Sequence, residues 1–231
     1  MKKKVIIVFL VFVFIGIFII HIPKVKIDIV ESYQYISVNT NNNINIELQI
    51  NCNQSIENDK FILKSERHKM KINKRKVYKL SDSKYKVVMC IDEKELSSAK
   101  DEYTQIEIIH KGRTIICPLG SIIIDKEEII EFEKVNVLAT LFSTDGRSFN
   151  VIVENNSEKL IEFKELSYEL EGTIIKEKLD LTIASGETCE TNIKLKMKYW
   201  GKNVIIRPVI LYATKDAEFK TLTHQCIYFI N

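Results

Sequence analysis

The chain has 231 residues, with 34 basic and 31 acidic side chains and a formal net charge of +3 at pH 7. A nucleic-acid-binding protein normally carries a strong basic excess, so this near balance disfavours that class. The length exceeds the roughly 100 to 150 residues typical of one domain, which predicts two domains after the N-terminal segment.

That N-terminal segment is the first predicted element. Three lysines, Lys2 to Lys4, precede an apolar stretch, and a helix from Val5 to Ile22 would be about 27 Å long, close to the thickness of a hydrocarbon core of about 30 Å. We therefore expect a transmembrane anchor at residues 5–22 and a cytoplasmic tail at residues 1–4, because basic flanks stay on the cytoplasmic side. The chain from Lys24 onward would then lie outside the plasma membrane. A cleaved secretory signal and a buried soluble helix are the two other interpretations.

Period-two alternation of apolar and polar residues predicts β-strands after this anchor. Between Ile44 and Cys52 every second residue is apolar, which places the apolar set on one face of a strand. Further strands are predicted at 85–91, 114–117, 122–124, 149–153, 191–199, 204–206, 209–212 and 227–230. Helical periodicity is nearly missing: residues 92–100 are expected to form one short helical turn, and residues 159–165 are ambiguous.

Turn residues indicate how these strands are connected. Asp145-Gly146 predicts a hairpin between two apolar stretches, and Ser185-Gly186-Glu187 predicts a turn before the next strand. Many short strands separated by turns predict two antiparallel β-sandwich domains, at residues 24–125 and 134–231. The charged segment 125–134 is the expected connector. A strand that continues from one sheet to the next is the other interpretation of this segment.

Two stretches of the second half carry a family resemblance. They are Phe149-Asn-Val-Ile-Val-Glu-Asn-Asn-Ser-Glu-Lys and Leu181-Thr-Ile-Ala-Ser-Gly-Glu-Thr. With the alternating strand that follows, they resemble bacterial extracellular immunoglobulin-like modules over about 50 residues. The resemblance implies an immunoglobulin-like fold and no active site, since such modules act as spacers, adhesive units or assembly surfaces. We expect an immunoglobulin-like sandwich in both halves.

The five cysteines leave the disulfide pattern open. Cys189 shares the strand parity of Ile193, and Cys226 lies in the last predicted strand, so a Cys189 to Cys226 disulfide is one interpretation. Two buried free thiols are the other. The remaining three cysteines leave one thiol unpaired, and the absence of C-x-x-C spacing argues against zinc or thioredoxin-like redox chemistry.

Local signatures of catalysis are missing from the sequence. The motifs G-x-S-x-G and H-E-x-x-H, the phosphate-binding loop and the dinucleotide glycine motif do not occur. His68, His110 and His224 lie in β-like segments and are expected to be partly exposed structural histidines. We therefore expect no enzyme activity, no metal and no cofactor. A cell-surface hydrolase whose site is assembled from distant residues is the alternative.

One charge cluster is a candidate binding surface. Basic side chains are concentrated between Lys60 and Lys86, and acidic side chains follow between Val87 and Glu133. The candidates lie around a predicted hairpin tip: Lys69, Lys71, Lys74, Arg75, Lys76 and Lys79. They would attract membrane headgroups, an anionic wall polymer or an acidic protein surface. The other interpretation, which we favour, is a solvated strand face that the acidic stretch neutralises.

Together these features predict a membrane-anchored extracellular binding or assembly module without catalytic activity, partnered by the membrane and by another membrane or surface protein or a wall polymer. The alternative is an accessory subunit whose anchor packs against a partner helix. Gly16 is the only small residue in the apolar segment, so no small-xxx-small face supports that packing.

Overall fold

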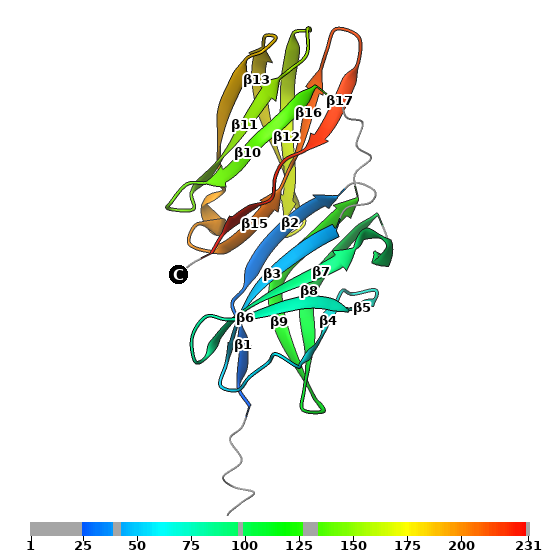
Figure 1. Ribbon diagram of the computed structural model, residues 1–231, viewed down its shortest axis with the longest axis vertical. Helices are drawn as coiled ribbons and strands as arrows, with labels where there is room; N and C mark the ends of the chain where they lie inside the picture. The colour runs from blue at the N-terminus through cyan, green and yellow to red at the C-terminus, as the bar shows by residue number, and fades with distance from the viewer. Residues whose placement is uncertain (1–24, 39–42, 97–98, 127–133, 230–231) are drawn as a thin grey trace, which may run out of the picture.

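The computed structural model describes residues 25–38, 43–96, 99–126 and 134–229, and most of them lie in β-strands. The strands form four sheets, here called A to D, in an elongated molecule (Figure 1). The predicted membrane segment at residues 5–22 lies outside the described residues, as does most of the predicted connector. No helix within the described ranges is long and apolar enough to cross a bilayer.

Sheets A and B build the half of the molecule that carries the first described residues. Sheet A has the order β1-β3-β7-β6 and is antiparallel throughout. Its strands are β1 (Ile27–Ile29), β3 (Asn43–Cys52), β6 (Lys74–Lys79) and β7 (Lys84–Asp92). Sheet B has the order β18-β15-β2-β9-β8-β4-β5. Its strands are β2 (Ser32–Val38), β4 (Lys60–Lys64), β5 (Lys69–Lys71), β8 (Lys100–His110), β9 (Arg113–Lys126), β15 (Asn203–Arg207) and β18 (Cys226–Tyr228).

Sheets C and D build the other half, at the top of Figure 1. Sheet C has the order β10-β11-β14, with β10 (Val135–Phe142), β11 (Ser148–Asn155) and β14 (Thr188–Lys194). Sheet D has the order β13-β12-β16-β17, with β12 (Ile161–Leu170), β13 (Thr173–Ile183), β16 (Val209–Ala213) and β17 (Glu218–Leu222). Two 3-10 turns, Glu93–Glu95 and Met197–Tyr199, are the helical segments of the described residues.

Two hydrophobic clusters hold these sheets together. The first lies between sheets A and B and includes Ile44, Ile46 and Leu48, which are fully buried as the alternation predicts. The second lies in the other half and includes Phe149 and Phe163. Each fully buried Ile, Leu or Phe side chain stabilises the fold by about 1.5 to 3 kcal/mol relative to exposure, so alternation on one strand face directs the packing.

Strands β2 and β9 contribute to both clusters. Ile36 of β2 packs in the first cluster, whereas its neighbour Tyr35 packs in the second. Ile122 and Ile123 of β9 divide in the same way. Because both faces are buried, these strands carry continuous apolar runs instead of an alternating pattern. Sheet B therefore continues from one half of the chain into the other.

The expectation of purely antiparallel sandwiches is wrong at this sheet. β2 pairs in parallel with β9 on one side and with β15 on the other, as the neighbouring positions of β2 and β15 in Figure 1 show. Parallel neighbours need a long connection and arise between distant segments, so no short-range turn signal in the sequence reports them.

The two turns that carry the immunoglobulin-like resemblance lie next to each other. Asn155 N–H donates to Glu187 O, and Gly186 N–H donates to Asn155 O. The buried Asn155 amide donates to the carbonyl oxygens of Lys159 and Ile183 and accepts from Ser157. An asparagine is suited to this place because its side chain satisfies main-chain groups that a turn leaves unpaired.

Other local predictions are mostly confirmed. The Asp145-Gly146 hairpin joins β10 to β11, with Gly146 at a positive φ of 66°. Glu93–Glu95 forms the expected helical turn, and the ambiguous segment 159–165 enters β12. The predicted strand 191–199 is too long, because β14 ends at Lys194 and the chain turns so that Tyr199 packs into the second cluster.

Candidate functional site

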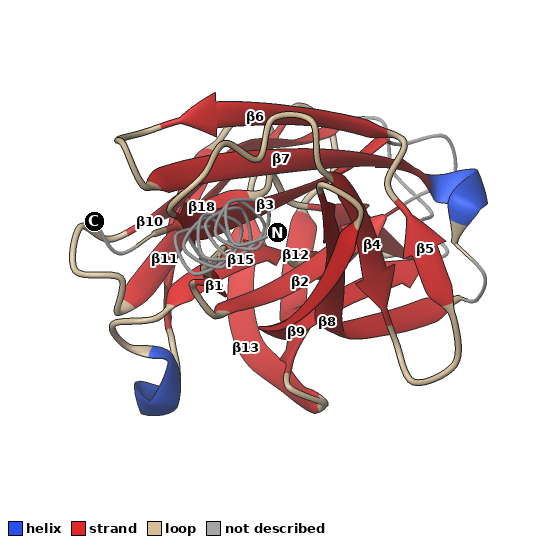
Figure 2. Cartoon of the chain, turned by 90° about the horizontal axis from the view of Figure 1, so that it is seen from below, coloured by secondary structure: helices blue, strands red, loops and turns tan. Residues whose placement is uncertain are grey.

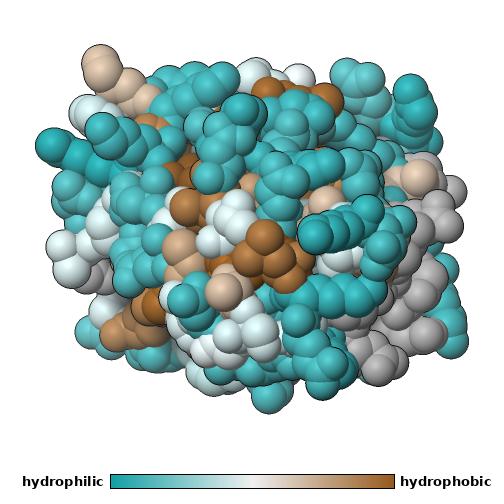
Figure 3. Space-filling model, turned by 90° about the horizontal axis from the view of Figure 1, so that it is seen from above, coloured by the Kyte–Doolittle hydropathy of each residue, from teal (hydrophilic) through white to brown (hydrophobic). Residues whose placement is uncertain are grey.

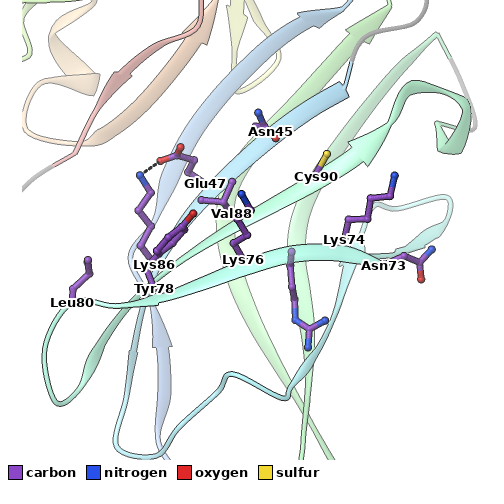
Figure 4. Close-up of a pocket in the computed structure, with 11 residues that line it drawn as sticks. Asn45, Glu47, Asn73, Lys74, Lys76, Tyr78, Leu80, Lys86, Val88 and Cys90 are labelled. Atoms are coloured by element: carbon purple, nitrogen blue, oxygen red, sulfur yellow. Dashed lines mark ion pairs between the residues drawn. The ribbon is translucent and has the colours of Figure 1, made fainter.

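A groove crosses the outer face of sheet A over β3, β7 and β6. It has a volume of about 890 Å³. The strand register builds its floor from three rows of outward side chains. These rows are Asn45, Cys90 and Lys74; Glu47, Val88 and Lys76; and Lys86 with Tyr78. Figure 4 shows Lys74 and Lys76 on the β6 side of this floor and Glu47 on the β3 side.

The charges in the groove are unevenly paired. Lys86 Nζ lies 2.6 Å from Glu47 Oε2, and this ion pair neutralises the centre of the floor. Lys74 and Lys76 are exposed and form no ion pair with any residue that the structure describes. Two uncompensated positive charges therefore line the β6 side of the groove, next to the exposed ring of Tyr78.

The other predicted basic residues are distributed elsewhere. Lys69 Nζ lies 2.7 Å from Glu107 Oε1, on the far strand β8 of sheet B. The hydrogen bond from Lys69, together with Lys64, holds the pKa of Glu107 below its ordinary value. Lys79 pairs with the nearby Asp82 at 3.2 Å. Part of the basic segment is thus neutralised by carboxylates.

The predicted hairpin tip from Lys69 to Lys79 is wrong. β5 pairs with β4 in sheet B, whereas β6 pairs with β7 in sheet A, so the chain crosses between the two sheets at this point. Lys71 is exposed on β5, on the other sheet from the groove. Arg75 turns inward, where its guanidinium lies 5.6 Å from the centre of the Phe61 ring. Of the six candidates, Lys74, Arg75 and Lys76 line the groove.

His110 is fully buried, contrary to the expected partial exposure. Its Nδ1 lies 2.8 Å from Asp59 Oδ2, and its Nε2 lies 3.1 Å from Gln54 Oε1. Lys111 Nζ donates to the same Gln54 oxygen at 2.8 Å. The imidazole thus bridges two acceptors inside the first half, which is the arrangement of a buried structural pair.

His68 lies among groups that also occur in hydrolases. Ser65 Oγ is 3.0 Å from its Nδ1, and Tyr103 Oη is 3.0 Å from its Nε2. Asp101 Oδ2 is 3.7 Å from the same Nε2. Burial and the Asp101 carboxylate raise the pKa of Tyr103, so the phenol stays protonated.

The Ser65 hydroxyl is held by the turn in which it lies. Its oxygen accepts the backbone N–H groups of Arg67 at 3.2 Å and of His68 at 3.0 Å. Such a pattern is typical of a serine that closes a turn. These bonds order the connection between β4 and β5, and they account for the serine and the histidine without assigning them a nucleophilic role.

All five cysteines are free thiols in the structure. The proposed bridge between Cys189 and Cys226 is therefore not formed, and the two differ in environment. Cys226 is buried, and this burial raises its pKa to about 12. Cys189 is partly exposed on β14. Within the described residues no cluster of His, Cys, Asp and Glu has the composition of a metal site.

The described residues at the end of the molecule formed by sheets C and D present no large apolar face in Figure 3. Figure 3 shows that hydrophilic side chains cover most of this end, with small hydrophobic patches between them. Leu160 and Ile174 are among the exposed apolar residues of this half of the molecule. Single exposed apolar residues are normal on soluble surfaces, so the groove on sheet A remains the main candidate.

No protein-family model matches the chain, and no curated protein matches it. Similar solved structures include a chimeric titin Z1Z2 carrying a KLER peptide from decorin, with 10% identity, a TM-score of 0.29, and coverage of 89% of this chain and 97% of that chain. Tandem immunoglobulin repeats of Dlar show 6% identity and a TM-score of 0.28 over 89% and 97% of the two chains. The titin domains z1z2 in complex with telethonin show 11% identity and a TM-score of 0.26 over 88% and 96%. The likeness is a weak one, of immunoglobulin-like fold class alone.

Sequence reasoning identified the lysines of the groove but not their neighbours. Glu47 and Lys86 lie 39 positions apart in the sequence and meet only through the β3–β7 register. The alternation of Ile44 to Cys52 did show which side chains face outward. It carried no information on which strand would lie beside them, because a register between distant strands is set by packing of the whole sheet.

Proposed function

We propose that this protein is a membrane-anchored extracellular binding or assembly module without catalytic activity, and that it engages an anionic partner through the groove on sheet A. The observation that carries this proposal is the pair Lys74 and Lys76, two exposed cations without an ion-pair partner among the described residues. Neighbouring cations such as Lys69 and Lys86 are already paired with carboxylates. An anionic partner would compensate the remaining two charges and would be attracted over a distance of about one Debye length, 8 to 10 Å.

The proposed anchor rests on residues 5–22, whose length and apolar character suit a bilayer core. The basic residues before it would hold the N-terminus in the cytoplasm, so the described β-strands would lie outside the cell. A membrane-impermeant maleimide tests this orientation in intact cells. We expect it to label the partly exposed thiols of Cys90 and Cys189. Protection of both until lysis would contradict the orientation.

The binding role is tested by photo-crosslinking from within the groove. A photoreactive phenylalanine analogue replaces Tyr78, whose side chain is 46% exposed, in full-length protein in its native membrane. The matched control carries the same analogue at Ile174, which is 62% exposed on sheet D. We expect an adduct from position 78 that is lost in the Lys74→Glu/Lys76→Glu background and is not seen from position 174. Equal adducts from both positions would reject the groove as the binding site.

A variant that lacks residues 1–22 separates this module from the accessory-subunit alternative. A stoichiometric partner that is lost together with the anchor would identify an accessory subunit held by membrane contacts. A partner that is retained, and that still requires Lys74 and Lys76, supports binding through the groove.

A further inference from the structure

We propose that the groove receives an extended acidic peptide segment of a protein partner, which adds to β6 as a further strand of sheet A. This inference rests on the proposed function and specifies the partner's chemistry. It combines three features of the same strand: its place at the edge of the sheet, its unpaired main-chain groups and its outward lysines.

The position of β6 leaves one side of its main chain open. β6 is the last strand in the order of sheet A and is the outermost strand when the molecule is viewed along its long axis (Figure 2). Leu80 N–H donates to Lys84 O across the β6–β7 pair, and main-chain directions alternate along a strand. The N–H and C=O groups of Arg75, Val77 and Lys79 therefore point away from β7. No described residue forms a hydrogen bond with them.

On the opposite edge of sheet A, outward main-chain groups of β3 are bonded to other parts of the chain. Where β3 runs beyond the short strand β1, three of its outward carbonyl oxygens are occupied. Gln49 O accepts from Val30 N–H, Glu47 O from the Gln34 amide at 2.9 Å, and Asn45 O from the Gln225 amide at 3.2 Å. The fold thus engages carbonyl oxygens of one edge of sheet A with its own groups and leaves the β6 edge available for pairing.

The outward side chains of β6 specify an acidic strand. Residues two apart on a strand lie about 6.6 to 6.8 Å apart on the same face, so Lys74 and Lys76 match carboxylates at alternate positions of an added strand. With antiparallel addition these positions would be non-hydrogen-bonded pairs, in which facing side chains approach most closely. Tyr78 and Leu80, 46% and 55% exposed, offer apolar contact beyond them. The partner segment would read apolar-x-acidic-x-acidic.

Charge also disfavours the other occupants of this edge. Pairing of β6 with β6 of a second copy would place basic side chains opposite each other, because four of its six residues are Lys or Arg. An anionic polymer would satisfy the lysines but would leave the N–H and C=O groups of Val77 and its neighbours without strand partners. A peptide satisfies the charges and the main chain together.

The test uses full-length protein in non-ionic detergent and a fluorescent eight-residue peptide of the pattern apolar-x-Glu-x-Glu, with binding measured by anisotropy. One peptide is N-methylated at the two x positions, whose N–H groups would face β6. The matched control is N-methylated at the two Glu positions, whose N–H groups would face solvent. We expect the first to bind about tenfold more weakly than the parent peptide and the second to bind as the parent does.

The protein side uses two charge-reversal variants with the same spacing. Lys74→Glu/Lys76→Glu is expected to weaken peptide binding about tenfold or more. Lys194→Glu/Lys196→Glu, which alters two exposed lysines at the last residue of β14 and just beyond it, is expected to leave it unchanged.

Two results would overturn the inference. The first would reject strand addition alone, and the second would also reject the proposed function. If both methylated peptides bind as tightly as the parent, and inorganic polyphosphate competes with them, the groove recognises charge alone. Strand addition would then be wrong while the proposed anionic-partner function stands. If neither the peptide nor polyphosphate binds, and position 78 yields no crosslink, strand addition and the proposed function both fail.

Discussion

The buried pair of Asp59 and His110 makes a strong prediction about stability. Both side chains are more than nine-tenths buried, and Asp59 Oδ2 lies 2.8 Å from His110 Nδ1. Asp59→Ala would leave the imidazole buried beside Gln54 without its carboxylate. Removing one partner of a buried hydrogen-bonded pair typically costs about 1 to 3 kcal/mol, because the remaining polar group is desolvated and uncompensated. We expect a loss of stability in this range.

Urea unfolding of the full-length protein in non-ionic detergent, followed by far-ultraviolet circular dichroism, measures this loss. With a slope of about 3 kcal/mol per M urea, at the upper end for small proteins, the midpoint should fall by about 0.3 to 1 M. The control is Asp216→Ala, which removes a 2.6 Å ion pair to Lys159 at a site where both side chains are more than half exposed. Exposed pairs contribute little, so its midpoint should hardly move.

A second variant separates pairing from packing. In Asp59→Ala/His110→Phe no polar group of the pair remains, while Gln54 Oε1 keeps its bond from Lys111 Nζ. We expect this double variant to recover part of the stability lost in the single one. Equal shifts for Asp59→Ala and Asp216→Ala would refute the argument from burial.

Four further outcomes are expected. Gly120→Ala should lower the melting temperature by about 5 °C or more, because Gly120 has a φ of +91° and a Cβ there would lie 2.6 Å from Ser32 O. Gly172→Ala is the control for backbone strain alone, because Gly172 has a φ of +67° and no atom lies within 4 Å of the added Cβ. In purified native protein a maleimide should modify Cys90 and Cys189 well before Cys226, and equal rates would contradict the burial of Cys226. Burial raises the pKa of Cys226 from its ordinary value near 9 to about 12, so this thiol ionises at lower pH in the unfolded chain. The free energy of unfolding should therefore fall as pH rises from 9 to 12. Cys226→Ala should lack this part of the pH dependence, and Cys189→Ala should keep it. Fluorescence of the single tryptophan, Trp200, and circular dichroism should report one coincident urea transition, because sheet B joins both halves. Two separated transitions would show that the halves unfold independently.

The sequence predicted local features of the fold better than distant ones. Alternation located β3, β7 and β11 because one face of each is buried and the other is solvated. It missed β2, whose residues are buried on both faces, and it split β9 into two short strands for the same reason. The Asp145-Gly146 and Ser185-Gly186 turns were found because their chemistry is local.

The residues of the groove were also predictable only in part, because strand pairing is not a local property of the sequence. The sequence showed that Lys74 and Lys76 belong to a basic segment, but the carboxylate that neutralises Lys69 comes from Glu107, 38 residues away. Which lysines stay uncompensated depends on strand order, and strand order follows from the packing of the whole molecule. The same limit explains why the segment around Asn73 crosses between sheets where the sequence predicts a hairpin.

The parallel pairing of β2 with β9 and β15 also has a mechanical consequence. β2 follows the N-terminal part of the chain and is hydrogen-bonded to β9 on one side and to β15 on the other. A pulling force between an N-terminal attachment and the far half would first load the three-residue pairing of β1 with β3. It would then run along β2 and load both of its ladders in shear, so that many hydrogen bonds share it at once. Two domains joined by a flexible linker would reorient and move apart under the same force. This chain would instead transmit tension as a single rod, holding the β6 edge at a fixed angle to the direction of pull.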